Sequence, residues 1–116
     1  MENHDRKRRA EIRRLLVGTG SEYTWISEET LQAIGVKREK KDQSFVMANG
    51  QQITRSVGFA VIHLAETFTT DEVVFAEEGN LQFLGARSLE GLNLRVDSRA
   101  KKLVAAGPIL AAAGTL

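Results

Sequence analysis

Residues 15–36, LLVGTGSEYTWISEETLQAIGV, place a glycine-rich turn between an apolar run and a run of aromatic and β-branched residues. The segment from Glu11 to Val17 predicts a strand that leads into the turn, and the segment from Tyr23 to Ile26 predicts a second strand. A short helix is expected next, because Ser27 can cap its N-terminus and Gly35 can end it. The stretch therefore predicts the order strand, turn, strand and helix.

The rest of the chain is predicted to consist mainly of strands. The pair Asn49-Gly50 predicts a β-hairpin with a type I′ turn, which needs positive φ at both central residues. The returning strand, 57–64, is apolar at almost every position and is expected to be buried on both faces. Further elements are predicted as strands at 73–75, at 81–85 and on both sides of 97–100, and as a marginal helix at 88–92. With about five to seven short strands and one or two short helices, the chain is predicted to be a mostly β domain.

Length and composition are those of one globular domain, 1–116. The chain is 42% hydrophobic and 27% charged. No apolar run approaches the ~20 residues that a membrane-spanning helix needs. Cysteine is absent, which excludes disulfides and thiolate metal sites. No apolar stretch near Met1 suits a secretory signal, so a cytoplasmic protein without a membrane partner is expected.

The charge distribution does not indicate a nucleic-acid partner. The formal net charge is +1, while residues 1–14 hold six Lys or Arg against three Asp or Glu. No aromatic residue lies among these cations to stack on bases, so a solvated edge or turn is expected there.

The turn fits neither of two common glycine motifs. A dinucleotide loop needs G-x-G-x-x-G at the start of a helix, but Tyr23 stands in place of the third glycine and a strand follows. A nucleophile elbow needs G-x-S-x-G, a pattern that Ser21 lacks. His63 lies in an apolar strand and is expected to be structural. Two isolated histidines without a spaced carboxylate make no metal site, so no metal or other cofactor is expected.

Four stretches taken together resemble the retropepsin-like aspartic peptidases, in particular the small bacterial members of that group. These stretches are LLVGTGSEYTWISEETLQAIGV, VMANGQQITRSVG, VVFAEEG and FLGARSLEGLNLRVDSRAKKLV, and they span residues 11 to about 104. A lone Thr-Gly-Ser would be weak evidence, but here the turn, helix, hairpin and Leu-Gly segment follow in order. The resemblance implies a closed, barrel-like β domain with one or two short helices, and a homodimer that cleaves polypeptides.

The resemblance also implies roles for particular residues. In this family each subunit supplies one aspartate from an Asp-Thr-Gly loop, and the two carboxylates share a proton. Thr19 would tie the two loops together, Gly20 would let their backbones approach, and the hairpin would close over substrate as a flap. Glu22 is expected either to help hold the peptide and pair with Arg87, or to form a surface ion pair. The substrate-binding group implied in this way is Ser21, Glu22, Ala48, Asn49, Gly50, Gln51, Leu84, Gly85 and Arg87.

The chain departs from the family at the residue that carries the chemistry. Gly18 stands where the catalytic aspartate is expected, and it offers neither a charge nor a proton acceptor. Loss of general acid–base catalysis removes a factor of roughly 10²–10⁴. The chain is therefore expected to be an inactive form of the peptidase. The alternatives are a non-catalytic peptide-binding or regulatory module, and a hydrolase that uses Glu22, which lies beyond the turn and is a poor substitute.

The two ends of the chain differ from the family pattern as well. Only 17 residues precede Gly18, so the polar segment 1–10 is expected to be the remnant of a first hairpin. The segment 105–116 is apolar and remains open to two interpretations. It is either a frayed end or a strand packed against the domain or against a partner subunit.

Overall fold

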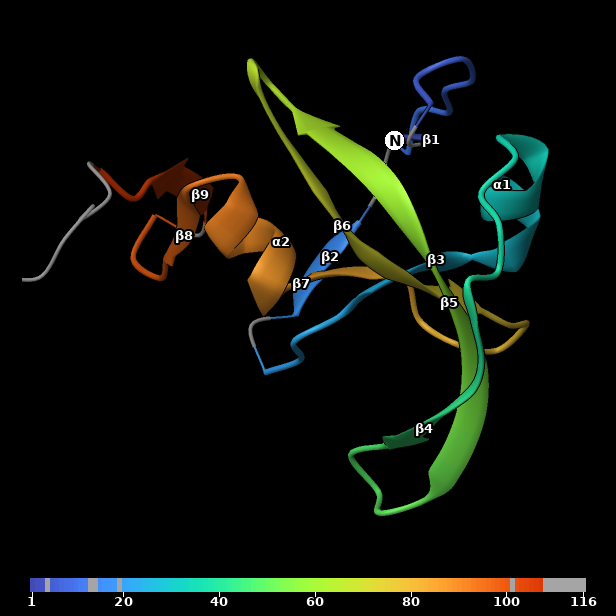
Figure 1. Cartoon of the computed structure of the whole chain (residues 1–116). Coiled ribbons are helices and arrows are strands. Elements are labelled where there is room, and N and C mark those ends of the chain that lie inside the picture. Colours follow the sequence, from blue (N-terminus) through green and yellow to red (C-terminus); the bar gives the residue numbers. More distant parts are fainter. Residues whose placement is uncertain (4, 13–14, 19, 101, 108–116) are drawn as a thin grey trace, which may run out of the picture.

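The computed structural model describes residues 1–3, 5–12, 15–18, 20–100 and 102–107. Nine strands and two short helices lie in this part of the chain (Figure 1). The strands are β1 (Glu2–Asn3), β2 (Leu16–Gly18), β3 (Thr24–Ser27), β4 (Lys40–Val46), β5 (Gln52–Leu64), β6 (Thr67–Ala76), β7 (Phe83–Gly85), β8 (Leu94–Asp97) and β9 (Lys102–Ala105), and the helices are α1 (Glu28–Ala33) and α2 (Ala86–Gly91). The prediction of a mostly β domain with short helices is confirmed.

Seven of the strands form one mixed sheet. Its hydrogen-bonded order is β1-β5-β6-β3-β7-β2, with β4 paired to β5, and β8 and β9 form a separate two-stranded sheet. The pairs β2–β7 and β3–β6 are parallel, whereas β4–β5 and β5–β6 are antiparallel. Across the described residues the end strands β1 and β2 do not pair with each other, so the sheet is open rather than a closed barrel.

The segment around the glycine turn differs partly from its prediction. The first predicted strand shortens to β2, which begins at Leu16 rather than at Glu11. The helix is confirmed, because the N–H of Thr30 donates to the Ser27 hydroxyl at 3.2 Å at the start of α1. Gly35 follows that helix with φ of 77°, in the left-handed region that commonly ends helices.

The turn of the long hairpin is not of type I′. Only Gly50, with φ of 84°, has positive φ, and Asn49 does not. The Gly50 N–H donates to the Met47 carbonyl at 2.8 Å, and the Gln51 N–H donates to the Asn49 side-chain oxygen at 2.9 Å. The Asn49 side chain thus stabilises the turn without a left-handed backbone at its own position, which is why the prediction was wrong.

Strand alternation divides the apolar residues into two clusters. Neighbours along one strand enter different clusters, as Trp25 and Ile26, Val74 and Phe75, and Phe83 and Leu84 all do. The larger cluster, called here the helix-side core, contains Ile26, Leu31, Ile34, Val36, Ala60, Ile62, Val73, Phe75, Leu84, Leu89 and Leu92. The smaller one, the cleft-side cluster, contains Trp25, Val57, Val74 and Ala76, with Tyr23, Phe45, Met47, Ile53 and Phe83 packed against it.

Strand β5 is not buried on both faces throughout, contrary to the prediction from its apolar sequence. Phe59 is 38% exposed and Leu64 is 37% exposed. Phe59 lies opposite Glu72 in the β5–β6 pairing, and Glu72 forms a 3.0 Å ion pair with Lys40. The side chain of Phe59 therefore lies beside a charged side chain of the neighbouring strand rather than an apolar one. Leu64 is the last residue of the strand.

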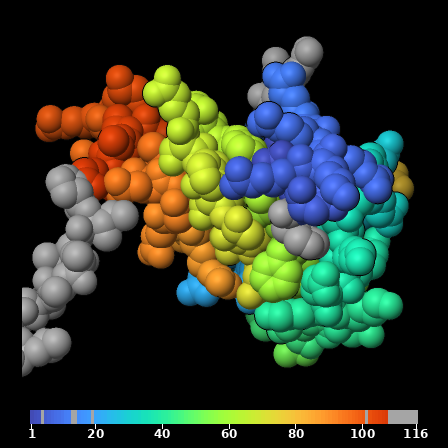
Figure 2. All heavy atoms as spheres, turned by 45° about the horizontal axis from the view of Figure 1, so that its top comes forward, coloured from blue at the N-terminus to red at the C-terminus, as the bar shows by residue number. Residues whose placement is uncertain are grey.

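The N-terminal segment forms a small turn at the edge of the sheet. β1 pairs with β5, and Glu2 also forms an antiparallel bridge to Arg9, so the described part of this segment folds back on itself. Figure 2 shows these residues (blue) on the side of the molecule away from α2 and the β8–β9 hairpin (orange to red).

The start of α2 is attached to the turn through three consecutive backbone N–H groups. The Gly85 N–H donates to the Thr24 hydroxyl at 2.9 Å, and the N–H groups of Ala86 and Arg87 donate to the carbonyls of residues 21 and 22. The first N–H groups of a helix lack partners within it, and α2 has no side-chain cap. The turn supplies the missing acceptors and thereby fixes β7 and α2 beneath it.

This attachment requires glycine at residue 85. A Cβ at Gly85 would lie 2.3 Å from the carbonyl oxygen of Tyr23, far inside contact distance. A buried polar network supports the same junction, since the Thr24 and Ser88 hydroxyls lie 2.6 Å apart and Ser88 donates to Asp71 at 2.9 Å. Thr24 and Ser88 are both fully buried.

Replacing Thr24 with valine should destabilise the protein. The substitution keeps the shape of the side chain but leaves the buried N–H of Gly85 without an acceptor, which costs about 1–3 kcal/mol. Chemical denaturation measures the change in the free energy of unfolding. The matched control is Thr70→Val, since Thr70 is exposed on β6. An equal loss in both variants would contradict the role of the network.

Candidate functional site

A cleft of about 640 Å³ lies between the turn that follows β2 and the tip of the β4–β5 hairpin. This volume falls within the range of small-ligand and side-chain binding sites. The loop between β6 and β7 forms its third wall. The lining residues are Gly18, Gly20, Ser21, Tyr23, Trp25, Phe45, Val46, Met47, Ala48, Gly79, Asn80, Leu81 and Phe83.

Four aromatic rings form a continuous wall of the cleft. Phe45 packs edge-on against Tyr23 at 5.6 Å and against Trp25 at 5.2 Å between ring centroids. Trp25 stacks on Phe83 at 6.1 Å. Such pairs contribute about 0.5–1.5 kcal/mol beyond the apolar area that they bury. The wall therefore joins the hairpin, β3 and β7 across the cleft.

Strand register brings these rings together. Tyr23 and Trp25 are two residues apart and point to one face of the sheet, and the same spacing puts Phe45 and Met47 on one side of the hairpin. Trp25 lies opposite Phe83 in the antiparallel β3–β7 pair. The cleft is thus the open edge of the cleft-side cluster.

The cleft has no charged side chain among its described lining residues. Its side-chain polar groups belong to Ser21, Tyr23, Trp25 and Asn80, and the Ser21 hydroxyl already donates to the Tyr23 carbonyl at 3.4 Å. None of these groups is a general base at neutral pH. The arrangement can bind an apolar group and a few backbone polar groups, but these side chains provide no acid–base pair.

A polar contact fixes the loop that forms the third wall. Arg55, on β5, donates from Nε to the Asn80 side-chain oxygen at 2.9 Å, and its Nη1 lies 3.7 Å from a Glu77 carboxylate oxygen. The N–H of Glu77 donates to the same Asn80 oxygen at 3.0 Å. The loop is therefore tied to the strand that carries the hairpin, and both walls are expected to move together.

The structure distributes the predicted site residues over several places. Gly18, Gly20, Ser21 and Ala48 line the cleft. Leu84 faces the other side of β7 and lines a second pocket, while Gly85 supports the turn from below. The remaining predicted residues Asn49, Gly50 and Gln51 form the hairpin tip next to the cleft without lining it, and Thr19 lies outside the described residues.

Glu22 and Arg87 are linked differently from the expected ion pair. The Arg87 backbone N–H donates to the Glu22 carbonyl at 3.1 Å. Its guanidinium instead lies 3.8 Å from an Asp71 carboxylate oxygen and 5.1 Å from the centre of the Tyr23 ring. Arg87 thus supports the aromatic wall from behind, and Glu22 is exposed.

Sequence reasoning missed most of the cleft wall, namely Tyr23, Trp25, Phe45, Val46, Met47, Gly79, Asn80, Leu81 and Phe83. The sequence does contain a local signal for part of this wall. Tyr23 and Trp25 are two residues apart, as are Phe45 and Met47, which is the spacing of side chains on one face of a strand. That signal shows which residues share a face of one strand. It does not show that three separate strands meet there.

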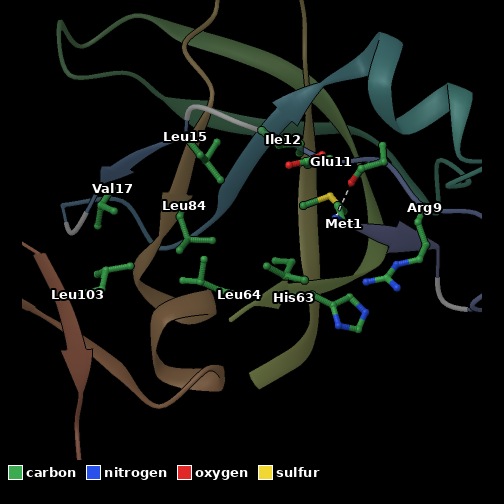
Figure 3. A pocket seen from close by; sticks show the side chains of 12 residues that line it. Met1, Arg9, Glu11, Ile12, Leu15, Val17, His63, Leu64, Leu84 and Leu103 are labelled. Carbon is green, nitrogen blue, oxygen red and sulfur yellow. Dashed lines mark hydrogen bonds between the residues drawn. The ribbon is translucent and has the colours of Figure 1, made fainter. Parts of the chain in front are cut away.

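A second pocket of about 460 Å³ lies on the other side of β7. Leu64, Leu84 and Leu103 converge on it from β5, β7 and β9, and Val17 adds to its apolar wall (Figure 3). Its other lining residues are Met1, Arg9, Ala10, Glu11, Ile12, Leu15, Ile62 and His63.

One end of this pocket carries the side-chain contacts of Glu2 that anchor the N-terminal segment. His63 Nε2 lies 2.6 Å from a carboxylate oxygen of Glu2, and Arg9 lies 3.8 Å from the other oxygen. The hydrogen bond with His63 lowers the pKa of Glu2, and the charge of Arg9 adds to this effect. Burial lowers the pKa of the Met1 amine, which donates to the Ala10 carbonyl at 2.7 Å. His63 is therefore a structural partner of Glu2.

A metal-ligand cluster and a membrane-spanning helix are both absent from the described part of the chain. No cluster of three or more His, Asp or Glu side chains that could hold a metal ion is found there. Neither of the two helices is long and apolar enough to cross a membrane.

Comparison with known proteins leaves the cleft to be interpreted from its own geometry. No protein-family model, curated protein or solved structure matches this chain.

The contacts of Glu2 with His63 and Arg9 should make the free energy of unfolding depend on pH in the acid range. Because folding lowers the pKa of Glu2 from its ordinary value of 4.5, its contribution is complete above that value and is lost as the pH falls through the folded-state pKa. The Glu2→Gln variant should be less stable than the unaltered protein at pH 7, and the difference should shrink at acid pH. Thermal unfolding across pH measures this. Glu66→Gln, at an exposed position, should show no such trend.

Proposed function

We propose that this chain is a retropepsin-like domain that binds an extended polypeptide segment between its glycine turn and its hairpin, without cleaving it. The observation that carries the proposal is the aromatic cleft between these two elements, which contains Gly18 where the family has its aspartate. The domain would then bind a peptide without catalysing its hydrolysis, since the aromatic wall of the cleft is present and the aspartate at residue 18 is not.

The shape and chemistry of the cleft support a peptide as the ligand. Apolar rings provide contact area, while Ser21, Asn80 and the backbone of the glycines at 18, 20 and 79 line the same space. A peptide offers both apolar side chains and backbone hydrogen-bonding groups. The hairpin, whose Phe45 and Met47 side chains line the cleft, would cover the bound segment and exclude water from it.

The arrangement beneath the turn supports the retropepsin-like assignment. A strand leads into the turn, β3 and α1 follow it, and the Leu84-Gly85 segment lies directly below, with Gly18 opposite Gly85 in the parallel β2–β7 pair. This is the order of elements on which the resemblance rests. To close into a barrel, the open sheet would need further pairing of its end strands β1 and β2.

We also propose a homodimer, formed through the turn and the edge of β2. β2 is the last strand of the sheet and pairs with β7 on one side. Leu16 is 60% exposed and Val17 is 39% exposed on this strand. An exposed apolar edge strand readily pairs with another chain.

Peptide binding is tested directly with the unaltered protein. Titration of blocked hexapeptides with a central bulky apolar residue should give saturable heat in calorimetry, and should change the fluorescence of Trp25, the single tryptophan. Phe45→Ala removes a ring from the wall and should weaken binding by about 2–4 kcal/mol, the loss typical of a hot-spot truncation. Phe59→Ala is the matched control, because Phe59 is 38% exposed and does not line the cleft.

Hydrolysis is measured on the same peptides between pH 3 and pH 7. The unaltered protein should leave them intact over this range, because no carboxylate occupies residue 18. Cleavage that Glu22→Gln abolishes would overturn the proposal and would identify a hydrolase built on Glu22.

The dimer is tested by sedimentation. Leu16→Lys places a charge on the exposed edge of β2 and should convert the dimer into a monomer at equal protein concentration. Phe68→Lys is the control, because Phe68 is 51% exposed on β6. A monomeric unaltered protein, or an unchanged dimer in Leu16→Lys, would contradict an interface at this edge.

A further inference from the structure

The dipeptide Asn49-Gly50 lies at the tip of the β4–β5 hairpin, which extends away from the body of the sheet (Figure 1). Both residues are exposed. The other asparagines of the chain all precede a residue with a side chain, and they are Asn3, Asn80 and Asn93. Asn49 is therefore the one asparagine whose successor has no Cβ.

This pair contains the two groups of a known side reaction of asparagine, which is among the thermolabile residues. The backbone nitrogen of the following residue forms a bond to the side-chain carbon Cγ, and the bond from Cγ to Nδ2 breaks. The proton that the nitrogen loses passes through water to the leaving group, which departs as ammonia. Water then opens the resulting succinimide ring at either carbonyl and leaves aspartate or isoaspartate.

Gly50 is suited to supply the attacking nitrogen. It carries no Cβ that would obstruct the approach of its nitrogen to Cγ of Asn49. Glycine also changes its backbone angles at little energetic cost. Both properties favour formation of the five-membered ring at this position over the other three asparagines.

The turn also activates the carbon that is attacked. The Gln51 N–H donates to Oδ1 of Asn49 at 2.9 Å. Negative charge develops on this oxygen as the nitrogen attacks, and a donor at about 2.7–3.1 Å from such an oxygen stabilises the transition state. The donor lies only two residues beyond Asn49, so the contact does not depend on distant parts of the fold.

A second hydrogen bond restrains the attacking nitrogen. The Gly50 N–H donates to the Met47 carbonyl at 2.8 Å, and this bond must break before the nitrogen reaches Cγ. Loss of one such bond should make the folded protein react roughly 3- to 10-fold more slowly than the unfolded chain. The turn slows the reaction without preventing it, because exposed loops open locally at low cost.

We propose that Asn49 is a site of spontaneous deamidation, through which water converts the neutral tip of the hairpin into an acidic one. The reaction adds a carboxylate beside a cleft that has no charged side chain among its described lining residues. Isoaspartate also adds one carbon to the backbone of the turn that joins the paired residues Val46 and Gln52. This modification does not depend on peptide binding.

The modification is measured on the whole folded protein, incubated at 37 °C and pH 7.5. Tryptic digestion places each of the four asparagines on a separate peptide, and mass spectrometry follows the acid formed at each. Asn49 should convert at least about tenfold faster than the other three, because glycine follows it alone. Fragmentation should identify both aspartate and isoaspartate at residue 49, as opening of a succinimide requires.

A pair of glycine variants tests the chemistry. Gly50→Ala places a methyl group on the attacking residue and should slow conversion of Asn49 at least about tenfold. Gly79→Ala is the matched control, because Gly79 has a similar φ of 89° and equally open surroundings but does not follow an asparagine. It should leave the rate at Asn49 unchanged. If Gly50→Ala does not fold, its rate in guanidinium chloride is compared with that of the unaltered chain in the same solution.

The outcomes distinguish the site from its restraint. Equal rates at all four asparagines, or an unchanged rate in Gly50→Ala, would overturn Asn49 as a deamidation site. The unaltered chain in guanidinium chloride should react roughly 3- to 10-fold faster than the folded protein. A folded-state rate at or above the rate of the unfolded chain would overturn the restraint by Met47.

Discussion

The attachment of β7 and α2 to the glycine turn organises the rest of the molecule. Three successive N–H groups, from Gly85 to Arg87, donate to oxygens of residues 21–24. This contact is possible only because Gly85 has no Cβ. It satisfies the start of a helix that has no side-chain cap, and it holds β7 between β2 and β3. The walls of the cleft are thereby fixed relative to the turn.

Side chains alternate along β3, β6 and β7, so these strands present two different faces. On one side Ile26, Phe75 and Leu84 enter the helix-side core, and on the other Trp25, Val74 and Phe83 enter the cleft-side cluster. The helix-side core stabilises the domain, because burying each large apolar side chain contributes about 1.5–3 kcal/mol. The cleft-side cluster is only partly covered, and its open edge is the cleft. The larger core and the open cleft thus lie on opposite faces of the same strands.

The chemistry of the cleft follows from which groups reach it. Aromatic rings and small residues line it, whereas no carboxylate is among its described lining residues. Asp71 accepts from Ser88 and pairs with Arg87 behind the wall, and Glu22 is exposed. A peptide in the cleft would meet apolar surface and backbone polar groups. Such an environment favours binding by side-chain burial over acid–base catalysis.

The sequence by itself determined the local elements of this protein. The order of strand, turn, strand and helix, the Ser27 cap, the hairpin at Asn49-Gly50 and the glycine at residue 18 are all readable from neighbouring residues, because caps, turns and alternation depend on contacts within a few positions. The tertiary structure decided what local patterns do not contain. It set the open sheet order, the pairing of Trp25 with Phe83, the use of Arg87 by Asp71 instead of Glu22, and the negative φ of Asn49. The physical reason is that each of these depends on register between distant segments or on a side-chain hydrogen bond that competes with backbone preference. Most of the cleft therefore emerged only when β3, the hairpin and β7 were brought side by side.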